Sequence, residues 1–268
     1  MQKHTHKHRE KESDRDGNIT LPTNITICNK DAHVLQDELI RFVYNGIENH
    51  HEDHKWLMER CILTPHNDSV NEINEKMIEA MPGEEIKSYS ADRVCKQERS
   101  DEDNENDFED VPIDFLNMLN YPGFPRHELK LKKNMILMLM RNINKKQGLC
   151  NGTRLILKEV MGSTLKCYNP VRKDTVFIPR IELRSDVKKG GFLWKRRQFP
   201  VQPAFSMTIN KSQGQTIKGK LGVYLYRSVF SHGQLYVALS RSTKQENVKI
   251  ALTETGKTAN IVLKNAVR

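Results

Sequence analysis

The stretch CILTPHNDSVNEINEKMIEAMPG, residues 61–83, decides the expected fold. It opens with the apolar residues 61–63, which predict a strand buried on both faces. A polar turn follows over residues 64–68. Apolar side chains then recur at the spacing of a helix that ends at Pro82-Gly83, namely at Val70, Ile73, Met77 and Ile78. A buried strand, a polar turn and a helix form the crossover unit of a parallel sheet, so the stretch predicts an α/β fold.

Segments on both sides of this stretch have the same character. Upstream, DAHVLQDELIRFVYN at residues 31–45 has the pattern of a short amphipathic helix. Downstream, the apolar runs AFSMTI (204–209), LGVYLY (221–226) and NVKIAL (247–252) predict strands. Between the last two, LYVALSRS (235–242) begins either a helix or a tight turn after a strand. The α/β pattern therefore returns in the last part of the chain.

The middle of the chain has a different pattern. ERSDEDNENDFED, residues 98–110, holds eight acidic residues and one basic residue, and we expect a loop at a domain boundary there. Residues 111–185 contain four or five strand-like runs separated by short polar turns, which predict a small β-barrel. Residues 126–158 hold nine Lys and Arg residues and one Glu. At the N-terminus, residues 1–19 are charged and expected to be disordered.

Composition narrows the class of protein. The 268 residues carry a formal net charge of +9, which favours a polyanionic partner and nucleic acid first, although a basic soluble protein without such a partner has the same charge. No apolar run reaches the length of about 18 residues that a membrane span needs, and no signal peptide is evident. The five cysteines form no CxxC pair and predict reduced thiols. The His-rich groups lack zinc-site spacing, so we expect no metal site.

Three polar segments contain the candidate binding and catalytic residues. TINKSQGQT (208–216) combines a cation, hydroxyls, amides and one Gly, which suit phosphate oxygens, but a solvated β-turn explains these residues equally well. GQLYVALSR (233–241) ends in Arg241, which is either a surface side chain or an arginine aimed at a γ-phosphate. RNINKKQGLCNGTR (141–154) predicts a hairpin whose basic residues either grip a nucleic-acid backbone or only form the turn.

Several segments together resemble one family, the Pif (petite integration frequency) DNA helicases of superfamily one, and most closely the Pif-like helicases of Helitron transposable elements. ERCILTPHNDSVNEIN resembles their motif IV region, RRQFPVQPAFSMTINKSQGQTI is similar to motif V, and FSHGQLYVALSRS is similar to motif VI. FPRHELKLKKNMILMLMRNINKKQGLCNGTRLIL looks like their inserted 2B domain, and ANIVLKNAV like their last segment. The segments follow the family's order from about residue 17 to about residue 265.

The resemblance implies a RecA-like parallel α/β domain, called domain 2A, with a small β-barrel, the 2B domain, inserted into it. Residues 20–110 and 186–268 would form domain 2A, and residues 111–185 would form the barrel. The family uses ATP and Mg²⁺, but its P-loop and magnesium ligands lie in a first RecA-like domain that we expect to be absent from this chain. The GKT at residues 256–258 does not change this expectation, because Ala251 stands where a P-loop needs Gly.

The resemblance also implies roles for individual residues. Arg241 would be the catalytic arginine that reaches ATP, and Gln213 and Gly214 would lie near the nucleotide. The residues expected near single-stranded DNA are His66, Asn67, Thr208, Asn210, Lys211 and Ser212. We add Arg141 and Asn142 of the hairpin as DNA-binding candidates. In motif VI, Ser242 stands where relatives often have an apolar residue, which is a minor departure.

Two functions are compatible with these observations. The first is the C-terminal half of an ATP-dependent 5′-to-3′ DNA helicase, whose partners are single-stranded DNA and a first RecA-like domain, and which does not hydrolyse ATP alone. The alternative is a non-catalytic DNA-binding remnant of a transposon-derived helicase. The family implies a nuclear location and roles in DNA repair, recombination or telomere maintenance.

Overall fold

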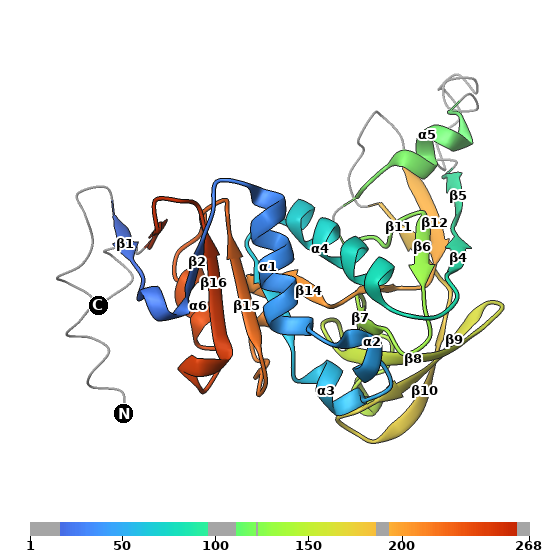
Figure 1. Ribbon diagram of the computed structural model, residues 1–268. Helices are drawn as coiled ribbons and strands as arrows, with labels where there is room; N and C mark the ends of the chain where they lie inside the picture. The colour runs from blue at the N-terminus through green and yellow to red at the C-terminus, as the bar shows by residue number, and fades with distance from the viewer. Residues whose placement is uncertain (1–16, 96–110, 122, 186–192, 262–268) are drawn as a thin grey trace. The chain divides into compact units, whose positions relative to one another are not determined.

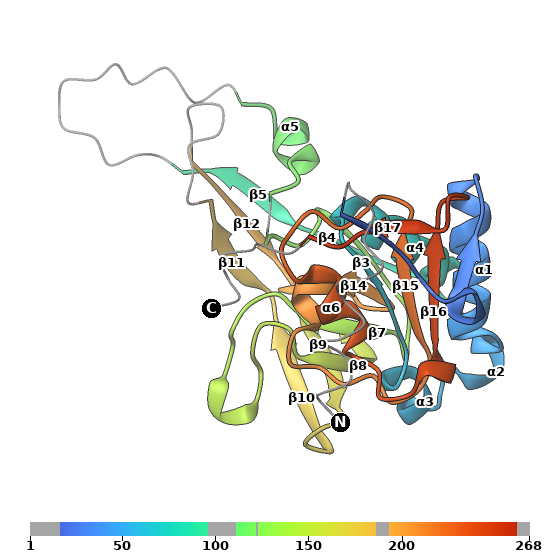
Figure 2. The ribbon, with the colours of Figure 1, turned by 90° about the vertical axis from the view of Figure 1, so that its left-hand side faces the viewer.

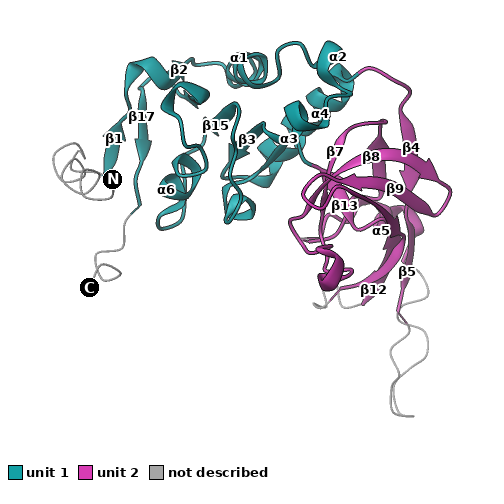
Figure 3. Cartoon of the chain, turned by 90° about the horizontal axis from the view of Figure 1, so that it is seen from below, with its two compact units in different colours: residues 1–81, 204–268 teal, residues 82–203 magenta. Residues whose placement is uncertain are grey.

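The chain divides into two compact units (Figure 3). The computed structural model describes residues 17–95, 111–121, 123–185 and 193–261. Unit 1 combines residues 1–81 with residues 204–268, and unit 2 is formed by residues 82–203. The charged N-terminus up to residue 16 and the acidic run 98–110 lie outside the described residues.

Unit 1 is built on a five-stranded sheet in the order β14–β3–β15–β16–β2, in which every neighbouring pair is parallel (Figure 1). The apolar stretch that decided the expected fold forms a strand near the middle of this sheet, with all of its residues buried, because both of its faces are covered. The prediction of a parallel α/β fold is confirmed. The strands are β2 (Thr26–Cys28), β3 (Cys61–Thr64), β14 (Ser206–Thr208), β15 (Leu221–Leu225) and β16 (Val248–Leu252).

Two helices, α1 (Ala32–Tyr44) and α4 (Asn67–Ala80), contact each other and pack on the sheet. The carboxylate of Asp31 caps α1 by accepting hydrogen bonds from the backbone N–H groups of His33 and Val34. Helix α1 approaches β15 closely because Gly222 has no side chain: a Cβ there would lie 2.9 Å from Cγ of Leu39. The amphipathic helix predicted at residues 31–45 is confirmed.

Side-chain hydrogen bonds join these helices to the strand β14, which is far from them in sequence. Asn74 of α4 accepts from the backbone N–H of Ser206 at 2.8 Å and donates to the carbonyl of the same residue at 3.1 Å. The Tyr44 hydroxyl at the end of α1 donates to the carbonyl of Phe205 at 2.7 Å. All four residues are buried, so these bonds satisfy polar groups that would otherwise destabilise the core.

The remaining elements of unit 1 are short. The segment that the sequence left open between helix and turn contains the helix α6, which lies on the opposite side of the sheet from α1 in Figures 2 and 3. An antiparallel pair, β1 with β17, joins the first and last described segments. The bounds are β1 (Asn18–Thr20), η1 (Thr23–Ile25), α2 (Ile47–His50), α3 (His54–Met58), η3 (Ile209–Ser212), α6 (Gln234–Leu239), η4 (Gln245–Asn247) and β17 (Lys257–Ala259).

Unit 2 is dominated by antiparallel sheets. The largest has five strands in the order β10–β9–β8–β7–β13, the second has the order β11–β12–β5, and the third pairs β4 with β6. The first sheet consists of β7 (Ile136–Leu139), β8 (Arg154–Met161), β9 (Thr164–Asn169), β10 (Asp174–Pro179) and β13 (Val201–Pro203). The other elements are β4 (Ile86–Tyr89), β5 (Ala91–Val94), α5 (Ile113–Met118), β6 (Glu128–Leu131), η2 (Lys145–Gln147), β11 (Ile181–Arg184) and β12 (Trp194–Gln198).

A buried ion pair anchors α5 and the segment after it inside unit 2. The Arg196 side chain is fully buried, and its Nη2 lies 2.6 Å from Oδ2 of Asp92. The guanidinium also donates to the carbonyls of Leu116 and Pro125, each at 3.0 Å. The Trp194 ring lies 4.9 Å from the guanidinium carbon and closes the cluster. The charge of Arg196 is therefore balanced and hydrogen-bonded, as burial of a charge requires.

The compact units differ from the predicted domains in their boundaries. The predictions placed the inserted domain at residues 111–185, whereas unit 2 spans residues 82–203. The strands β4 and β5, assigned by sequence to the first part of the α/β domain, pair with β6 and β12 inside unit 2. The strand β13 likewise pairs with β7. The difference arises because pairing partners lie far apart along the chain.

Candidate functional site

The predicted site residues of unit 1 lie in segments that follow neighbouring strands at one edge of the sheet. The strands β14 and β3 are parallel and in register, with Thr208 opposite Thr64, and each is followed by a polar segment. The neighbouring strand β15 ends at Leu225 and leads to α6. Carboxyl ends of parallel strands meet at the same edge, which is where open α/β sheets bind ligands. Motifs IV, V and VI therefore begin at, or are reached from, one side of unit 1.

The first turn of TINKSQGQT is the 3-10 helix η3, which is anchored from inside. Ile209 and Ser212 are fully buried. The Ser212 hydroxyl donates to the Ile209 carbonyl at 2.6 Å, so it closes the turn instead of facing solvent. Among the predicted DNA contacts, Ser212 thus has a structural role in this conformation, because its burial separates the hydroxyl from the surface. Asn210, between them, is exposed.

A type II β-turn follows over residues 212–215. Gln213 has φ −57° and ψ 130°, Gly214 has φ +80°, and the Gln215 N–H donates to the Ser212 carbonyl at 3.0 Å. A type II turn needs a positive φ at its third position, which explains the Gly. Gln213 and Gly214 are both exposed at the tip, and a Cβ at Gly214 would meet no atom within 4 Å. The two predicted nucleotide contacts thus border open space.

Arg241 fastens motif VI to this turn. Its Nη1 donates to the carbonyls of Gln215 at 3.0 Å and Ser212 at 3.4 Å. Its Nε donates to the Val237 carbonyl at 3.0 Å, and Nη2 to the Ser240 hydroxyl at 2.9 Å. The guanidinium therefore bridges α6 and the type II turn. All of its acceptors are neutral, so the charge of Arg241 has no acidic partner among these contacts.

Gln234, at the first position of α6, makes a second connection between the motifs. Its side chain is 2% exposed, and Oε1 accepts from the backbone N–H of Phe230 at 3.1 Å. Its Nε2 is directed at Oδ1 of Asn210 at the longer distance of 3.4 Å. Sequence reasoning did not single out Gln234, although its position in the GQLYVALSR segment was the signal that would have indicated it.

An aromatic pair lies beside these residues. The rings of His66 and Phe230 have centroids 5.2 Å apart, and the Nε2 atom of His66 lies 3.3 Å from the Ser228 carbonyl. Phe230 is 58% exposed, which is unusual for a phenylalanine. Asn67 begins α4 and is exposed. Phe230 was not predicted from the sequence, because a single Phe in a polar segment has no periodic signal.

Two more candidates of motif V are half-buried. Thr208 ends β14, and Lys211 lies within η3. Burial lowers the pKa of the Lys211 ammonium from its ordinary value, because removal from water disfavours the charged form. An anion near Lys211 would act in the opposite direction.

The two hairpin candidates belong to unit 2. Arg141 donates to the Met140 carbonyl at 3.2 Å, and its guanidinium carbon lies 5.8 Å from the centre of the Phe124 ring. The Asn142 side chain accepts from the backbone N–H of Asn151 at 2.9 Å and braces the turn. Both side chains thus have internal contacts, and they are not part of the site on unit 1.

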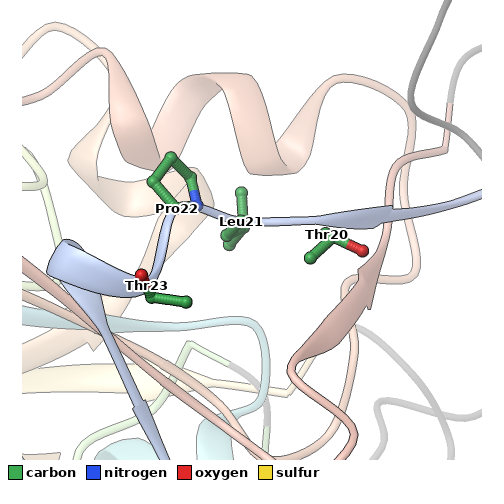
Figure 4. Close-up of a pocket in the computed structure, with 4 residues that line it drawn as sticks. All are labelled: Thr20, Leu21, Pro22 and Thr23. Carbon is green, nitrogen blue, oxygen red and sulfur yellow. The ribbon is translucent and has the colours of Figure 1, made fainter.

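The described residues also bear on metal binding, membrane insertion and surface pockets. No group of three or more His, Cys, Asp or Glu side chains suited to a metal ion occurs in these ranges. Within the same ranges, no helix is long and apolar enough to cross a membrane. A surface pocket is lined by Thr20, Leu21, Pro22 and Thr23 (Figure 4), none of which belongs to the candidate site.

A family match and similar solved structures define the class of protein. Residues 114–160 match the family described as DNA helicase Pif1, 2B domain. Pif1 helicase from Candida albicans has a similar structure, with a TM-score of 0.52 and 21% identity over 82% of this chain and 53% of that chain. A Bacteroides Pif1 helicase in complex with ADP-AlF3 and ssDNA gives a TM-score of 0.51 and 17% identity over 86% of this chain and 49% of that chain. The fold is that of a RecA-like helicase domain with a 2B insertion.

Relatives in sequence identify the family. The ATP-dependent DNA helicase Pif1 of Campylobacter jejuni is 29% identical over 227 residues, which are 81% of this chain and 46% of that protein. The human ATP-dependent DNA helicase PIF1 is 30% identical over 190 residues, which are 70% of this chain and 26% of that protein. The chain belongs to the Pif family of DNA helicases and corresponds to their C-terminal portion. It spans about half the length of the Campylobacter relative and about a quarter of the human one.

Proposed function

We propose that the chain is the C-terminal part of an ATP-dependent 5′-to-3′ DNA helicase. In this role it binds single-stranded DNA and contributes Arg241 to ATP hydrolysis. The observation that carries the proposal is the direct bond between motif VI and motif V, in which Arg241 reaches the Gln215 carbonyl at 3.0 Å. A single side chain thus connects the segment expected at the nucleotide with the segment expected at DNA.

The residues at this edge suit the phosphates of a nucleotide. Gln213 and Gly214 are exposed beside open space, and the guanidinium of Arg241 carries a fixed charge with planar donors. Phosphate oxygens are stronger acceptors for a guanidinium than the neutral carbonyls that it contacts here. When bound, ATP supplies the γ-phosphate whose developing negative charge such an arginine stabilises.

The magnesium part of the proposal rests on the resemblance to the family. We propose that a first RecA-like domain supplies both the P-loop and the Mg²⁺ ligands. On this proposal, the chain alone does not hydrolyse ATP.

The DNA part of the proposal rests on the edge that carries His66, Asn67 and Asn210. Exposed Asn67 and Asn210 offer amide groups to a phosphate backbone. The exposed ring of Phe230, packed against His66, offers a surface on which a base can stack. Bacteroides Pif1, which has a similar fold, has been solved bound to ssDNA, and this favours the same partner for this chain.

The test measures DNA binding and ATP hydrolysis on the full chain. Fluorescence anisotropy with a labelled oligothymidine should show binding that weakens steeply with salt. Phe230→Ala should weaken it by about 1–3 kcal/mol, the usual contribution of one stacked base. Phe177→Ala is the matched control, because Phe177 of unit 2 is 55% exposed and Phe230 is 58% exposed. Equal effects of the two substitutions would remove Phe230 from the site.

ATP hydrolysis distinguishes the two candidate functions. The chain alone should show no DNA-stimulated turnover. Turnover that Arg241→Ala abolishes would show that the chain contains a complete catalytic centre and would refute our assignment of the P-loop to another domain. Single-strand binding without any hydrolysis in the presence of a first RecA-like domain would favour the non-catalytic DNA-binding alternative.

A further inference from the structure

The three-stranded sheet β11–β12–β5 of unit 2 has one buried face and one charged face. Along β12, Trp194, Arg196 and Gln198 are buried, whereas Lys195 and Arg197 alternate with them. Because successive side chains of a strand point to opposite sides, Lys195 and Arg197 belong to the outer face. The strands lie side by side in Figures 1 and 2, and the pairing is antiparallel on both sides of β12.

A row of three cations crosses this outer face. Lys195 is opposite Arg184 of β11 on one side and opposite Arg93 of β5 on the other. Side chains directly opposite each other on neighbouring strands have Cβ atoms about 4.5–5.5 Å apart, and like charges in such positions are destabilising. The Arg93 and Arg184 side chains are 67% and 70% exposed. A row of this kind favours an anion from outside the sheet.

One acidic residue, Glu182, partly balances the row. Its carboxylate is 2.5 Å from Arg93, 3.0 Å from Lys195 and 3.5 Å from Arg184. Hydrogen bonds from Lys195 and Arg93 lower the pKa of Glu182 to about 2, so it is ionised at neutral pH. One carboxylate shared by three cations leaves the row with a net charge of +2.

Arg197 adds a fourth cation. It stands opposite Glu182 in the strand register, but within the described residues no ion pair joins the two. The charge of Arg197 instead acts on Arg180, whose pKa is lowered by burial and, to a smaller extent, by Arg197. Arg93, Arg184, Lys195 and Arg197 contribute +4 and Glu182 contributes −1, so the outer face has a net charge of +3.

We propose that this outer face, formed by Arg93, Glu182, Arg184, Lys195 and Arg197, binds the phosphate backbone of duplex DNA. Three of the four cations are arginines, whose planar donors match phosphate oxygens. None of these five described side chains is aromatic, so the five offer no ring on which an unstacked base can stack, as single-strand sites do. The proposed site lies entirely in unit 2 and does not depend on ATP or on the edge of unit 1.

The test uses anisotropy of the full chain with a labelled blunt hairpin duplex over a salt series. Arg197→Ala should reduce the slope of log K against log salt by about 1, because one phosphate contact is lost. Between about 50 and about 200 mM salt, this difference amounts to about 3.5-fold in affinity. Lys166→Ala is the control, since Lys166 is a half-buried cation of β9 that is paired with Glu159.

Glu182→Gln gives the sharper result, because it should strengthen duplex binding. The substitution releases three cations from their shared carboxylate and raises the net charge of the face from +3 to +4. A merely structural ion-pair network would instead lose thermal stability without a gain in affinity. Near-ultraviolet circular dichroism checks that each variant is folded.

Three results would overturn the proposal. The first is an equal effect of Arg197→Ala and Lys166→Ala on duplex binding, and the second is no gain in affinity from Glu182→Gln. Displacement of the duplex by polyglutamate at equal charge concentration would point to an acidic protein partner and would also overturn it. The oligothymidine measurements on Phe230→Ala are independent, so a failure here is distinguishable from a failure of the proposed helicase role.

Discussion

Replacing Arg241 by alanine tests whether this arginine stabilises the type II turn of motif V, in addition to its proposed contact with a nucleotide. The substitution removes the donors that reach the carbonyls of Gln215 at 3.0 Å and Ser212 at 3.4 Å across the loop. The bonds to Val237 and Ser240 are local to α6 and its end, so their loss does not separate the two motifs. The type II turn should therefore open more often in the variant.

The magnitude follows from the two cross-loop bonds. A hydrogen bond from a charged donor contributes about 1.5–3 kcal/mol, and the longer bond to Ser212 contributes less because of its poor geometry. Arg241 is half-buried, so solvent reduces these values, and we expect the loop to lose about 1–3 kcal/mol. A change of this size multiplies the population of the open loop by about 5 to about 150.

Amide hydrogen exchange measures this opening directly. The N–H groups of Gln215 and Ile217, which bond to the carbonyls of Ser212 and Arg241, should exchange faster by that factor. The N–H of Ile62, bonded to Phe205 inside the sheet, should not change. Lys244→Ala is the control for lost charge. Unchanged exchange at Gln215 and Ile217 in the Arg241→Ala variant would refute a structural role for the arginine.

Three further outcomes are expected from other positions. Gly214→Ala should destabilise unit 1 by about 1 kcal/mol in urea unfolding, purely through its positive φ, since the added methyl has open space; a loss several times larger would contradict this reason. Asp92→Asn should cost about 3–5 kcal/mol in thermal unfolding of unit 2, because Arg196 would lose its buried counter-charge, and a change within experimental error would contradict the inferred ion pair. Glu182 stabilises the folded chain above pH 4.5, and this contribution should disappear as the pH falls from 4.5 to about 2; carboxyl NMR shifts that titrate near 4.5 would contradict it.

The regular elements could be predicted because they depend on local patterns. Residues 61–63 are apolar without interruption and form a buried strand, and the helical spacing of Val70 and Ile73 gives α4. The fold class and the family were confirmed by the comparisons. The roles of the site residues, the likeness to Helitron helicases and the nuclear location stay predictions.

The remaining features depend on contacts that no local pattern contains. Ser212 is buried because η3 is anchored by the buried side chain of Ile209. The same sequence of polar residues is equally compatible with an exposed turn. The position of Phe230 beside His66 joins residues that follow two different strands. The boundaries of unit 2 depend on pairs such as Asp92 with Arg196, which are 104 residues apart.

The insertion of unit 2 into unit 1 has a consequence for the order in which a ribosome delivers the parts of the sheet. The strand β3 is synthesised long before its neighbours β14 and β15, because residues 82–203 come between. At about 5–20 residues per second, this delay is roughly 6–24 seconds. Unit 2 is continuous in sequence and can fold during that interval. During that interval, Tyr44 and Asn74 lack their hydrogen-bond partners Phe205 and Ser206, which have not yet been synthesised. The edges of β3 are also unpaired in the nascent chain, and they are the surfaces that a chaperone would need to protect.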